Sequence, residues 1–137
     1  MIQEIFVVED EPELIDVLKD KFKKDTDIRL KHVLSDDLGK RLLDIPSFIL
    51  INEDKLVSLD IFKLCEIIRN SEDNSATPVV AVCSNLSFEH ERELLGSGVH
   101  SCVNRPFDGN NLYFMLKNIV SLMLINRGIS PLTKLPR

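Results

Sequence analysis

The chain has 137 residues, of which 44% are hydrophobic and 28% are charged, and its formal net charge is -5. This length and this balance of residues predict one globular domain. The apolar runs of the chain are too short to cross a bilayer, and its acidic net charge argues against nucleic-acid binding. Three widely spaced cysteines and an opening stretch without the pattern of a signal peptide favour the reducing cytoplasm.

The first half of the chain predicts three strands and two helices. Residues 5–8 and 48–52 are short apolar runs rich in β-branched residues, which is typical of strands buried on both faces of a parallel sheet. Residues 28–33 alternate between apolar and polar side chains, as in a half-exposed strand. Helices are expected over residues 12–24 and 35–43, where apolar residues recur at helical spacing. In the second helix, Ser35 is the expected cap, and the expected buried face is Leu38, Leu42 and Leu43.

The second half continues this alternation. Helical spacing of apolar residues predicts helices over residues 61–68, 87–95 and 108–126, and apolar runs predict strands over 78–82 and 100–103. Five strands that alternate with five helices, joined by short connections, predict an α/β fold within residues 1–126. We expect a doubly wound five-stranded parallel sheet of the flavodoxin-like type.

The polar residues that follow the strands are the candidates for function. In open parallel sheets the working groups lie just past the carboxyl ends of the strands, so these residues should meet at one edge of the sheet. They are Glu9 and Asp10 after the first strand, Asn52 at the end of the third, Cys83 and Ser84 after the fourth, and Arg105 before Pro106 after the fifth.

With these motifs the sequence resembles the receiver domains of bacterial two-component response regulators, over about residues 1–126. The matching segments are Val7-Val8-Glu9-Asp10-Glu11-Pro12, Thr77-Pro78-Val79-Val80-Ala81-Val82 and Arg105-Pro106-Phe107. The resemblance implies that Asp10 binds a magnesium ion directly and Glu9 through water, and that the Arg105-Pro106 bond is cis. In that family an Asp at the end of the third strand takes a phosphoryl group from a histidine kinase, and a Ser or Thr and a Lys contact the phosphoryl oxygens.

Three of these five functional positions depart from the family. Asn52 stands at the position of the acceptor Asp, Cys83 at that of the Ser or Thr, and Arg105 at that of the Lys. The neutral amide of Asn52 has almost no nucleophilicity, so phosphoryl transfer to it is not expected. The loss of one carboxylate should leave the magnesium site weak or vestigial, with Asp54 as a candidate third acid.

The other altered residues leave alternatives open. Cys83 is either a small buried apolar group or a redox-active thiol, and Ser84, one position later, is a candidate substitute for the missing hydroxyl. Arg105 is either a permanent internal counter-ion or a solvent-exposed Arg before a turn. The acids with which it could pair are Glu9, Asp10 and Asp54.

Residues 127–137 are expected to be a linker. Within them, Ser130-Pro131-Leu132-Thr133-Lys134-Leu135-Pro136-Arg137 resembles the entry segment of GGDEF domains, the diguanylate cyclase module, which commonly begins Asp-x-Leu-Thr-Gly-Leu-Pro-Asn-Arg. The resemblance implies that the chain is a fragment followed by an output domain. Departures at Ser130, Lys134 and Arg137 put the activity of such a cyclase in doubt, and the alternative is a Pro-rich tail.

The expected function is that of a pseudo-receiver in a two-component system. Such a regulatory domain does not accept phosphate, is not itself an enzyme, needs no cofactor and controls an attached output domain through protein contacts. One alternative is a working receiver phosphorylated at Asp54 or Glu53 by a histidine kinase. Another is a flavin- or nucleotide-binding flavodoxin-like protein, which the acidic run after the first strand disfavours because it would repel a phosphate.

The last predicted helix suggests a homodimer. One face suffices to dock this helix on the sheet and comprises Leu112, Met115, Leu116, Ile119 and Met123. Val120, Leu124 and Ile125 lie largely outside that face, and we expect them to pair with a second copy. The alternative is an apolar helix end that the tail covers.

Overall fold

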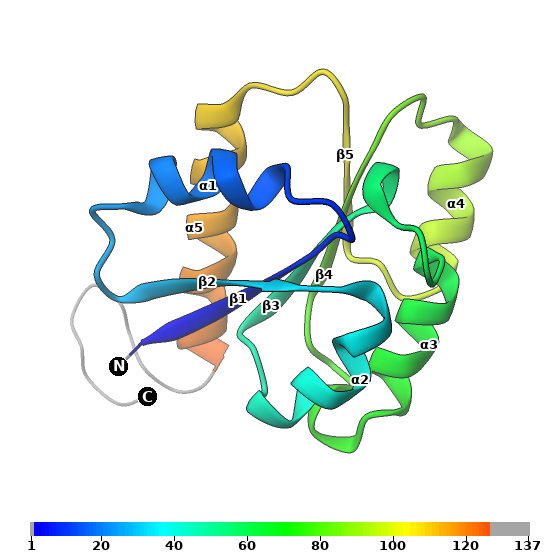
Figure 1. Ribbon diagram of the computed structural model, residues 1–137, viewed down its shortest axis with the longest axis horizontal. Coiled ribbons are helices and arrows are strands. Elements are labelled where there is room, and N and C mark those ends of the chain that lie inside the picture. Colours follow the sequence, from blue (N-terminus) through cyan, green and yellow to red (C-terminus); the bar gives the residue numbers. More distant parts are fainter. Residues whose placement is uncertain (1, 127–137) are drawn as a thin grey trace.

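The computed structural model describes residues 2–126, which form a five-stranded parallel sheet with helices on both faces (Figure 1). The strands are β1 (Gln3–Val8), β2 (Ile28–Val33), β3 (Phe48–Asn52), β4 (Val79–Cys83) and β5 (Ser101–Asn104). All neighbouring pairs are parallel, in the order β2-β1-β3-β4-β5, so β3 lies at the centre. The predicted doubly wound α/β fold is confirmed.

The helices divide between the two faces of the sheet. Helices α1 (Leu14–Phe22) and α5 (Gly109–Asn126) cover one face, and α2 (Leu38–Arg41), α3 (Ile61–Asn70) and α4 (Phe88–Gly96) cover the other. Successive residues of a strand point to opposite faces, so β3 sends Ile49 and Ile51 into the core under α3, and Phe48 and Leu50 into the core under α1. Burial on both sides explains why its apolar run is continuous rather than alternating.

The second predicted helix is broken into three short pieces. Two 3-10 turns, η1 (Ser35–Asp37) and η2 (Leu42–Asp44), flank α2. Leu38 and Leu42 are buried as predicted, but Leu43 is 85% exposed, because the tighter winding of η2 turns it away from the sheet. The expectation that Ser35 caps this helix was also wrong, since its side chain makes no capping hydrogen bond and contacts Asp10 instead.

Helix α5 corrects one prediction about the dimer interface. Its buried residues recur every four positions and are Leu112, Leu116 and Val120, all packed in the core under α1. Val120 is 5% exposed, so the prediction that it lies outside the docking face was wrong. Leu124 is half-buried and Ile125 is exposed. The other exposed apolar residues of the helix are Phe114 and Leu122.

Two further 3-10 turns complete the fold, η3 (Glu53–Lys55) directly after β3 and η4 (Glu72–Asn74) before β4. Within residues 2–126, none of the helices combines the length and the apolar character that crossing a bilayer requires. The predicted linker and GGDEF-like segment, residues 127–137, lies outside the described part of the chain.

Candidate functional site

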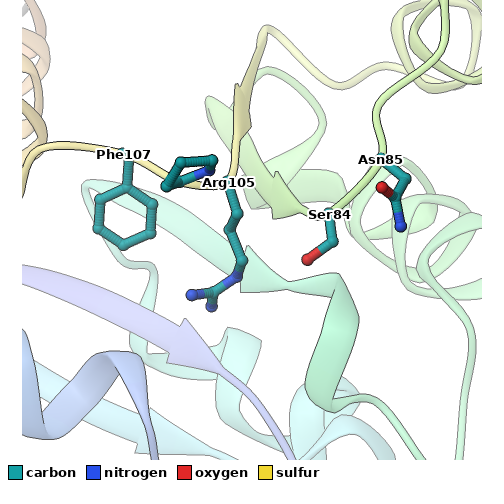
Figure 2. A pocket seen from close by; sticks show the side chains of 5 residues that line it. Ser84, Asn85, Arg105 and Phe107 are labelled. Atoms are coloured by element: carbon teal, nitrogen blue, oxygen red, sulfur yellow. The ribbon is translucent and has the colours of Figure 1, made fainter.

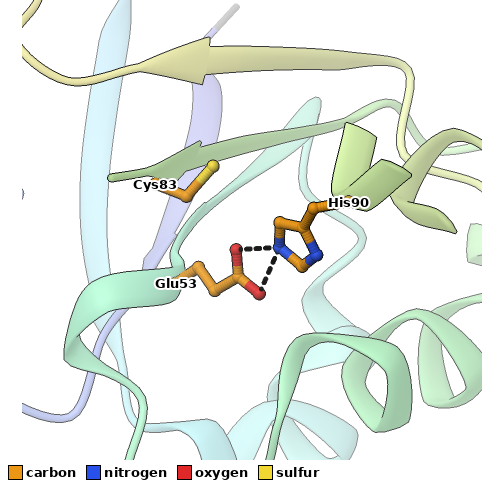
Figure 3. A group of neighbouring side chains, drawn as sticks. All are labelled: Glu53, Cys83 and His90. Atoms are coloured by element: carbon orange, nitrogen blue, oxygen red, sulfur yellow. Dashed lines mark hydrogen bonds and ion pairs between the residues drawn. The ribbon is translucent and has the colours of Figure 1, made fainter. Parts of the chain in front are cut away.

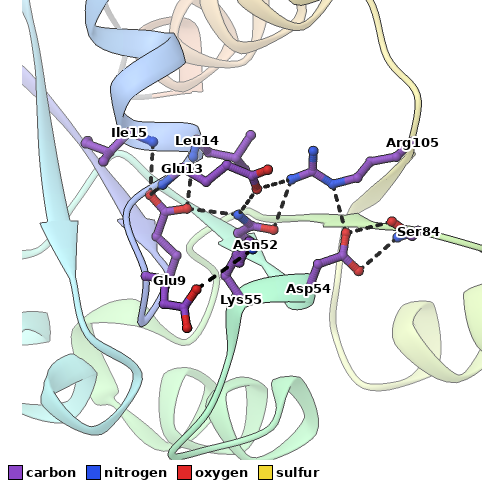
Figure 4. Close-up of polar contacts among 10 residues, drawn as sticks. Glu9, Glu13, Leu14, Ile15, Asn52, Asp54, Lys55, Ser84 and Arg105 are labelled. Atoms are coloured by element: carbon purple, nitrogen blue, oxygen red, sulfur yellow. Dashed lines mark hydrogen bonds and ion pairs between the residues drawn. The ribbon is translucent and has the colours of Figure 1, made fainter.

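The carboxyl ends of the strands meet around Asn52, the last residue of β3. Its side chain is fully buried, and both parts of its amide are engaged (Figure 4). Nδ2 donates to Glu9 Oε1 and to Glu13 Oε1, each at 2.9 Å, and Oδ1 accepts from Arg105 Nη2 at 3.2 Å. Two carboxylates on one side of the amide require N–H donors there, which fixes its orientation. Asn52 is therefore a hydrogen-bonding centre that joins three segments of the chain.

Glu9 caps helix α1. Its carboxylate is fully buried and accepts from the backbone N–H groups of Glu13, Leu14 and Ile15, each at 3.0 Å. Helix α1 lacks a capping side chain at its own N-cap position, so Glu9 satisfies the orphan donors and places its charge at the positive end of the helix. With the fourth bond from Asn52, each carboxylate oxygen accepts two hydrogen bonds, which uses its lone pairs.

Asp10 points away from this cluster. Its carboxylate accepts from the backbone and the hydroxyl of Ser35, at 2.9 and 2.8 Å, and from the backbone N–H groups of Val57 and Ser58. Burial raises the pKa of the Asp10 carboxyl, but the hydrogen bonds from Val57, Ser35 and Ser58 outweigh it, so the pKa lies below its usual value. Asp10 thus ties η1 to the segment after η3.

Arg105 is the cation of the cluster. Its Nε donates to Asp54 Oδ2 at 2.8 Å and its Nη2 to Glu13 Oε1 at 2.7 Å. It follows β5 and precedes Pro106, and the predicted cis bond between the two is confirmed. Arg105 is an internal counter-ion as predicted, with Asp54 among its predicted partners. Glu9 and Asp10, the other two acids with which it was expected to pair, are not its partners, and its second acid is Glu13.

The two residues after Val82 face different neighbours. Ser84 joins the Arg105 cluster, with its backbone N–H donating to Asp54 Oδ1 at 3.1 Å and its Oγ to Asp54 Oδ2 at 2.9 Å. Cys83 instead lies beside Glu53. Burial is the main cause, and the negative charge of Glu53 the second, that raises the pKa of the Cys83 thiol to about 12. The free thiol therefore stays protonated at neutral pH and is a poor redox nucleophile.

A surface pocket opens next to this cluster (Figure 2). It is lined by Ser84, Asn85, Arg105, Pro106 and Phe107. The Arg105 guanidinium carbon lies 5.3 Å from the centre of the Phe107 ring, which holds the side chain along one wall. The charged end of Arg105 already binds Asp54 and Glu13, so the pocket does not present a free cation.

The comparisons with known proteins give a consistent result at the level of structure. No protein-family model matches the sequence, and no curated protein matches it. The signal receiver domain of a LuxO repressor protein from Vibrio parahaemolyticus superposes with a TM-score of 0.77 at 16% identity, over 93% of this chain and 96% of that one. Chemotaxis protein CheY4 of Vibrio cholerae gives 0.76 at 12% identity, over 87% of this chain and 99% of that one. The chain has the receiver fold.

A third similar structure contains a metal ion. The receiver domain of sensor histidine kinase PA1611 from Pseudomonas aeruginosa has a magnesium ion in its active-site cleft and matches with a TM-score of 0.67 at 24% identity, over 88% of this chain and 98% of that one. The residues present here do not fit such an ion. The carboxylates of Glu9, Asp10 and Asp54 bind three separate sets of N–H and O–H donors, and Asn52 adds no charge among them.

The sequence located most of this site and missed two of its members. It placed Glu9, Asn52, Ser84 and Arg105 at one edge, where the structure brings them together. It gave no role to Glu13, which bridges Asn52 and Arg105. It also gave none to His90 on α4, which lies beside Glu53. Glu13 could have been suspected as the last acid of the run that follows β1.

Proposed function

We propose that the chain is a pseudo-receiver, a regulatory domain with the receiver fold that does not accept a phosphoryl group and acts through protein contacts. The observation that carries the proposal is the bonding of Asn52. An acceptor at this position needs an ionised carboxylate with a free lone pair to attack the donor. The amide of Asn52 has no charge, and its oxygen and nitrogen are committed to Arg105, Glu9 and Glu13.

The alternative acceptors are also committed. The two oxygens of Asp54 bind Ser84 and Arg105, and the two oxygens of Glu53 bind His90 Nε2 at 2.8 and 3.0 Å. Both residues lie in η3, beyond the end of β3, and these contacts reduce the nucleophilicity of their carboxylates. We therefore favour the pseudo-receiver over phosphorylation at Asp54 or Glu53.

The test is exposure of the chain to acetyl phosphate and magnesium, followed by intact-mass spectrometry. A receiver domain already shown to accept a phosphoryl group from acetyl phosphate, treated in parallel, controls for the activity of the donor. We expect the mass of the chain to stay unchanged, because Asn52 is neutral and the carboxylates of Glu53 and Asp54 are held by His90, Ser84 and Arg105. A hydroxylamine-sensitive adduct of one phosphoryl group would overturn the proposal, and its location at Asp54 or Glu53 would establish the alternative.

Magnesium should bind weakly for the same structural reason. An ion would have to displace the donors on Glu9 and Asp10, each of which is already satisfied by the backbone. Isothermal titration calorimetry should give no sub-millimolar constant. A clear constant in that range would show that the carboxylates rearrange around an ion.

We further propose that the domain works as a homodimer through α5, which would hold two output domains side by side. Phe114 and Leu122 are 60% and 58% exposed, and Ile125 is 36% exposed, so the helix carries apolar surface that the sheet does not cover. Leu122→Glu should convert a dimer into a monomer in light scattering. Leu43→Glu is the matched control, since Leu43 is 85% exposed but lies on η2. A wild-type chain that stays monomeric at all accessible concentrations contradicts this assembly.

A further inference from the structure

Three side chains with metal-binding atoms meet on the side of the sheet that faces α4 (Figure 3). Glu53 begins η3, Cys83 ends β4 and His90 lies in α4. One carboxylate oxygen, the thiol sulfur and one imidazole nitrogen lie within 4.8 Å of one another. We propose that these residues form a binding site for a divalent transition-metal ion of the zinc type. The proposal is independent of whether the domain accepts phosphate.

The donor set selects the class of metal. Thiolate and imidazole suit zinc and its neighbours in the transition series, whereas magnesium and calcium prefer oxygen ligands. Ionised Glu53 and Cys83 together supply two negative charges, which balance a divalent cation, and neutral His90 adds a third ligand. Three protein ligands leave one position of a tetrahedral ion open to solvent.

The geometry needs only small side-chain movements. Around a tetrahedral zinc ion the ligand atoms lie about 3.3–3.8 Å apart, given bond lengths of about 2.0–2.3 Å. His90 Nε2 lies 2.8 Å from Glu53 Oε1, so this pair must open slightly, and since all three atoms lie within 4.8 Å of one another, the other pairs need to close by no more than about 1–1.5 Å. Cys83 is fixed by β4 and is 2% exposed, whereas the side chains of Glu53 and His90 are 21% and 30% exposed. Those two can therefore rotate, and they leave a path for the ion.

Binding would exchange protons for the metal. The S–H bond of Cys83 is replaced by a sulfur–metal bond, and its proton leaves to solvent. Nε2 of His90, which now donates to Glu53, becomes a ligand, and the ring carries its proton on Nδ1. No oxidation or reduction takes part, so the step needs no co-reactant.

The ion would fix helix α4 to the sheet. Within α4, Leu94 is the buried residue, and the contact between His90 and Glu53 is the polar link to the end of β3. A metal bridge would add bonds from α4 to both β4 and η3, the turn that directly follows β3. The same helix exposes Phe88 and Leu95, so the ion would also set the position of an apolar surface. Helix α4 should then gain protection in hydrogen exchange when zinc is added.

The experiment titrates the untagged chain with cobalt(II), which reports thiolate ligation by its charge-transfer absorption, and then displaces the cobalt with zinc. One ion per chain with a thiolate band is expected. Cys83→Ser and His90→Ala should each weaken binding by more than about 100-fold, because loss of even an outer partner of a metal ligand costs about 10- to 100-fold. Cys102→Ser, on the neighbouring strand β5, is the matched control and should bind as the wild type does.

Three results would overturn the proposal: cobalt without a thiolate band, unchanged affinity in Cys83→Ser or His90→Ala, or loss of binding in Cys102→Ser. Circular dichroism checks that each variant is folded. If Cys83→Ser does not fold, Cys83→Ala and His90→Ala decide the question, since His90 lies at the surface of α4 and its removal leaves the core intact.

Discussion

Asn52→Asp introduces the residue that the resemblance to receiver domains implies at this position, yet the structure predicts that it destabilises this protein. The substitution removes both N–H donors of the amide and places a new carboxylate between Glu9 and Glu13, each 2.9 Å from Nδ2. It therefore replaces two attractive contacts by two repulsive ones in a fully buried position. Arg105 would donate to a carboxylate instead of an amide, which recovers part of the loss.

The expected magnitude follows from the two hydrogen bonds that the substitution removes. A hydrogen bond to a charged group contributes about 1.5–3 kcal/mol, so the two bonds together represent about 3–6 kcal/mol. After the gain at Arg105, we expect the free energy of unfolding to fall by about 3 kcal/mol, similar to breaking a buried ion pair. In urea unfolding this corresponds to a midpoint lower by about 1.5–2 M, for a slope of about 1.5–2 kcal/mol/M. The loss should shrink at acidic pH, where the introduced carboxyl can stay protonated and donate one hydrogen bond.

The matched control is Asn104→Asp at the end of β5. Asn104 is exposed, and its Oδ1 accepts from the backbone N–H of Leu86 at 3.2 Å, a role that a carboxylate oxygen fills equally well. Its stability should stay within about 0.5 kcal/mol of the wild type. If Asn52→Asp is as stable as Asn104→Asp at neutral pH, the amide is not the hydrogen-bonding centre described here.

Three further substitutions test other contacts. Asp10→Asn should lower the free energy of unfolding at neutral pH, measured in urea. Because the pKa of Asp10 is lowered in the folded state, the ionised carboxylate stabilises the fold above the ordinary carboxyl pKa. This contribution is lost as the pH falls through the pKa of the folded state, so variant and wild type should become equally stable at acidic pH. Arg105→Lys should lower the free energy of unfolding by about 1–2 kcal/mol in the same assay, since an ammonium cannot reproduce the forked contacts of the guanidinium to Asp54 and Glu13. Tyr113 is the one tyrosine of the chain, and its hydrogen bond to Asp25 raises its pKa. Asp25→Ala, which removes the acceptor, should return the absorbance titration of Tyr113 toward the ordinary phenol value, and an unchanged titration would rule out the contact.

The fold was predictable because burial on both faces leaves a clear mark in the sequence. The run Phe48–Ile51 is continuous and apolar as a central parallel strand requires. Helical spacing located α1, α3 and α5, because each of these helices buries one stripe of apolar residues against the sheet. The prediction of buried residues failed at Leu43, because the 3-10 turn η2 has three residues per turn instead of 3.6 and turns this side chain outward. It also failed at Val120, which the four-residue spacing after Leu112 and Leu116 places in the core.

The positions of the site residues were predictable, but their directions were not. Glu9 and Asp10 are adjacent, and consecutive residues leave a strand on opposite sides, so Glu9 reaches α1 and Asp10 reaches η1. The partner of Arg105 depended on how far a long side chain extends, which the sequence does not specify. These contacts arise from tertiary packing and carry no local pattern.

The register of the strands could have predicted that the adjacent residues Cys83 and Ser84 contact different neighbours. Asn52 pairs with Val82 in the parallel ladder between β3 and β4. Extending that register by one and two residues sets Glu53 beside Cys83 and Asp54 beside Ser84. The structure shows both pairs, on opposite sides of the sheet. Strand order and register were therefore the missing information, rather than residue type.

The most direct test of the central claim is the nitrogen-15 NMR signal of the Asn52 side-chain amide, recorded before and after addition of acetyl phosphate and magnesium. Because both N–H groups of this buried amide donate to carboxylates, we predict slow exchange with deuterium and no change on addition of the phosphodonor. Rapid exchange, or a shift of these signals when the donor is added, would contradict the account of Asn52 as a fixed hydrogen-bonding centre in a receiver fold without phosphoryl chemistry.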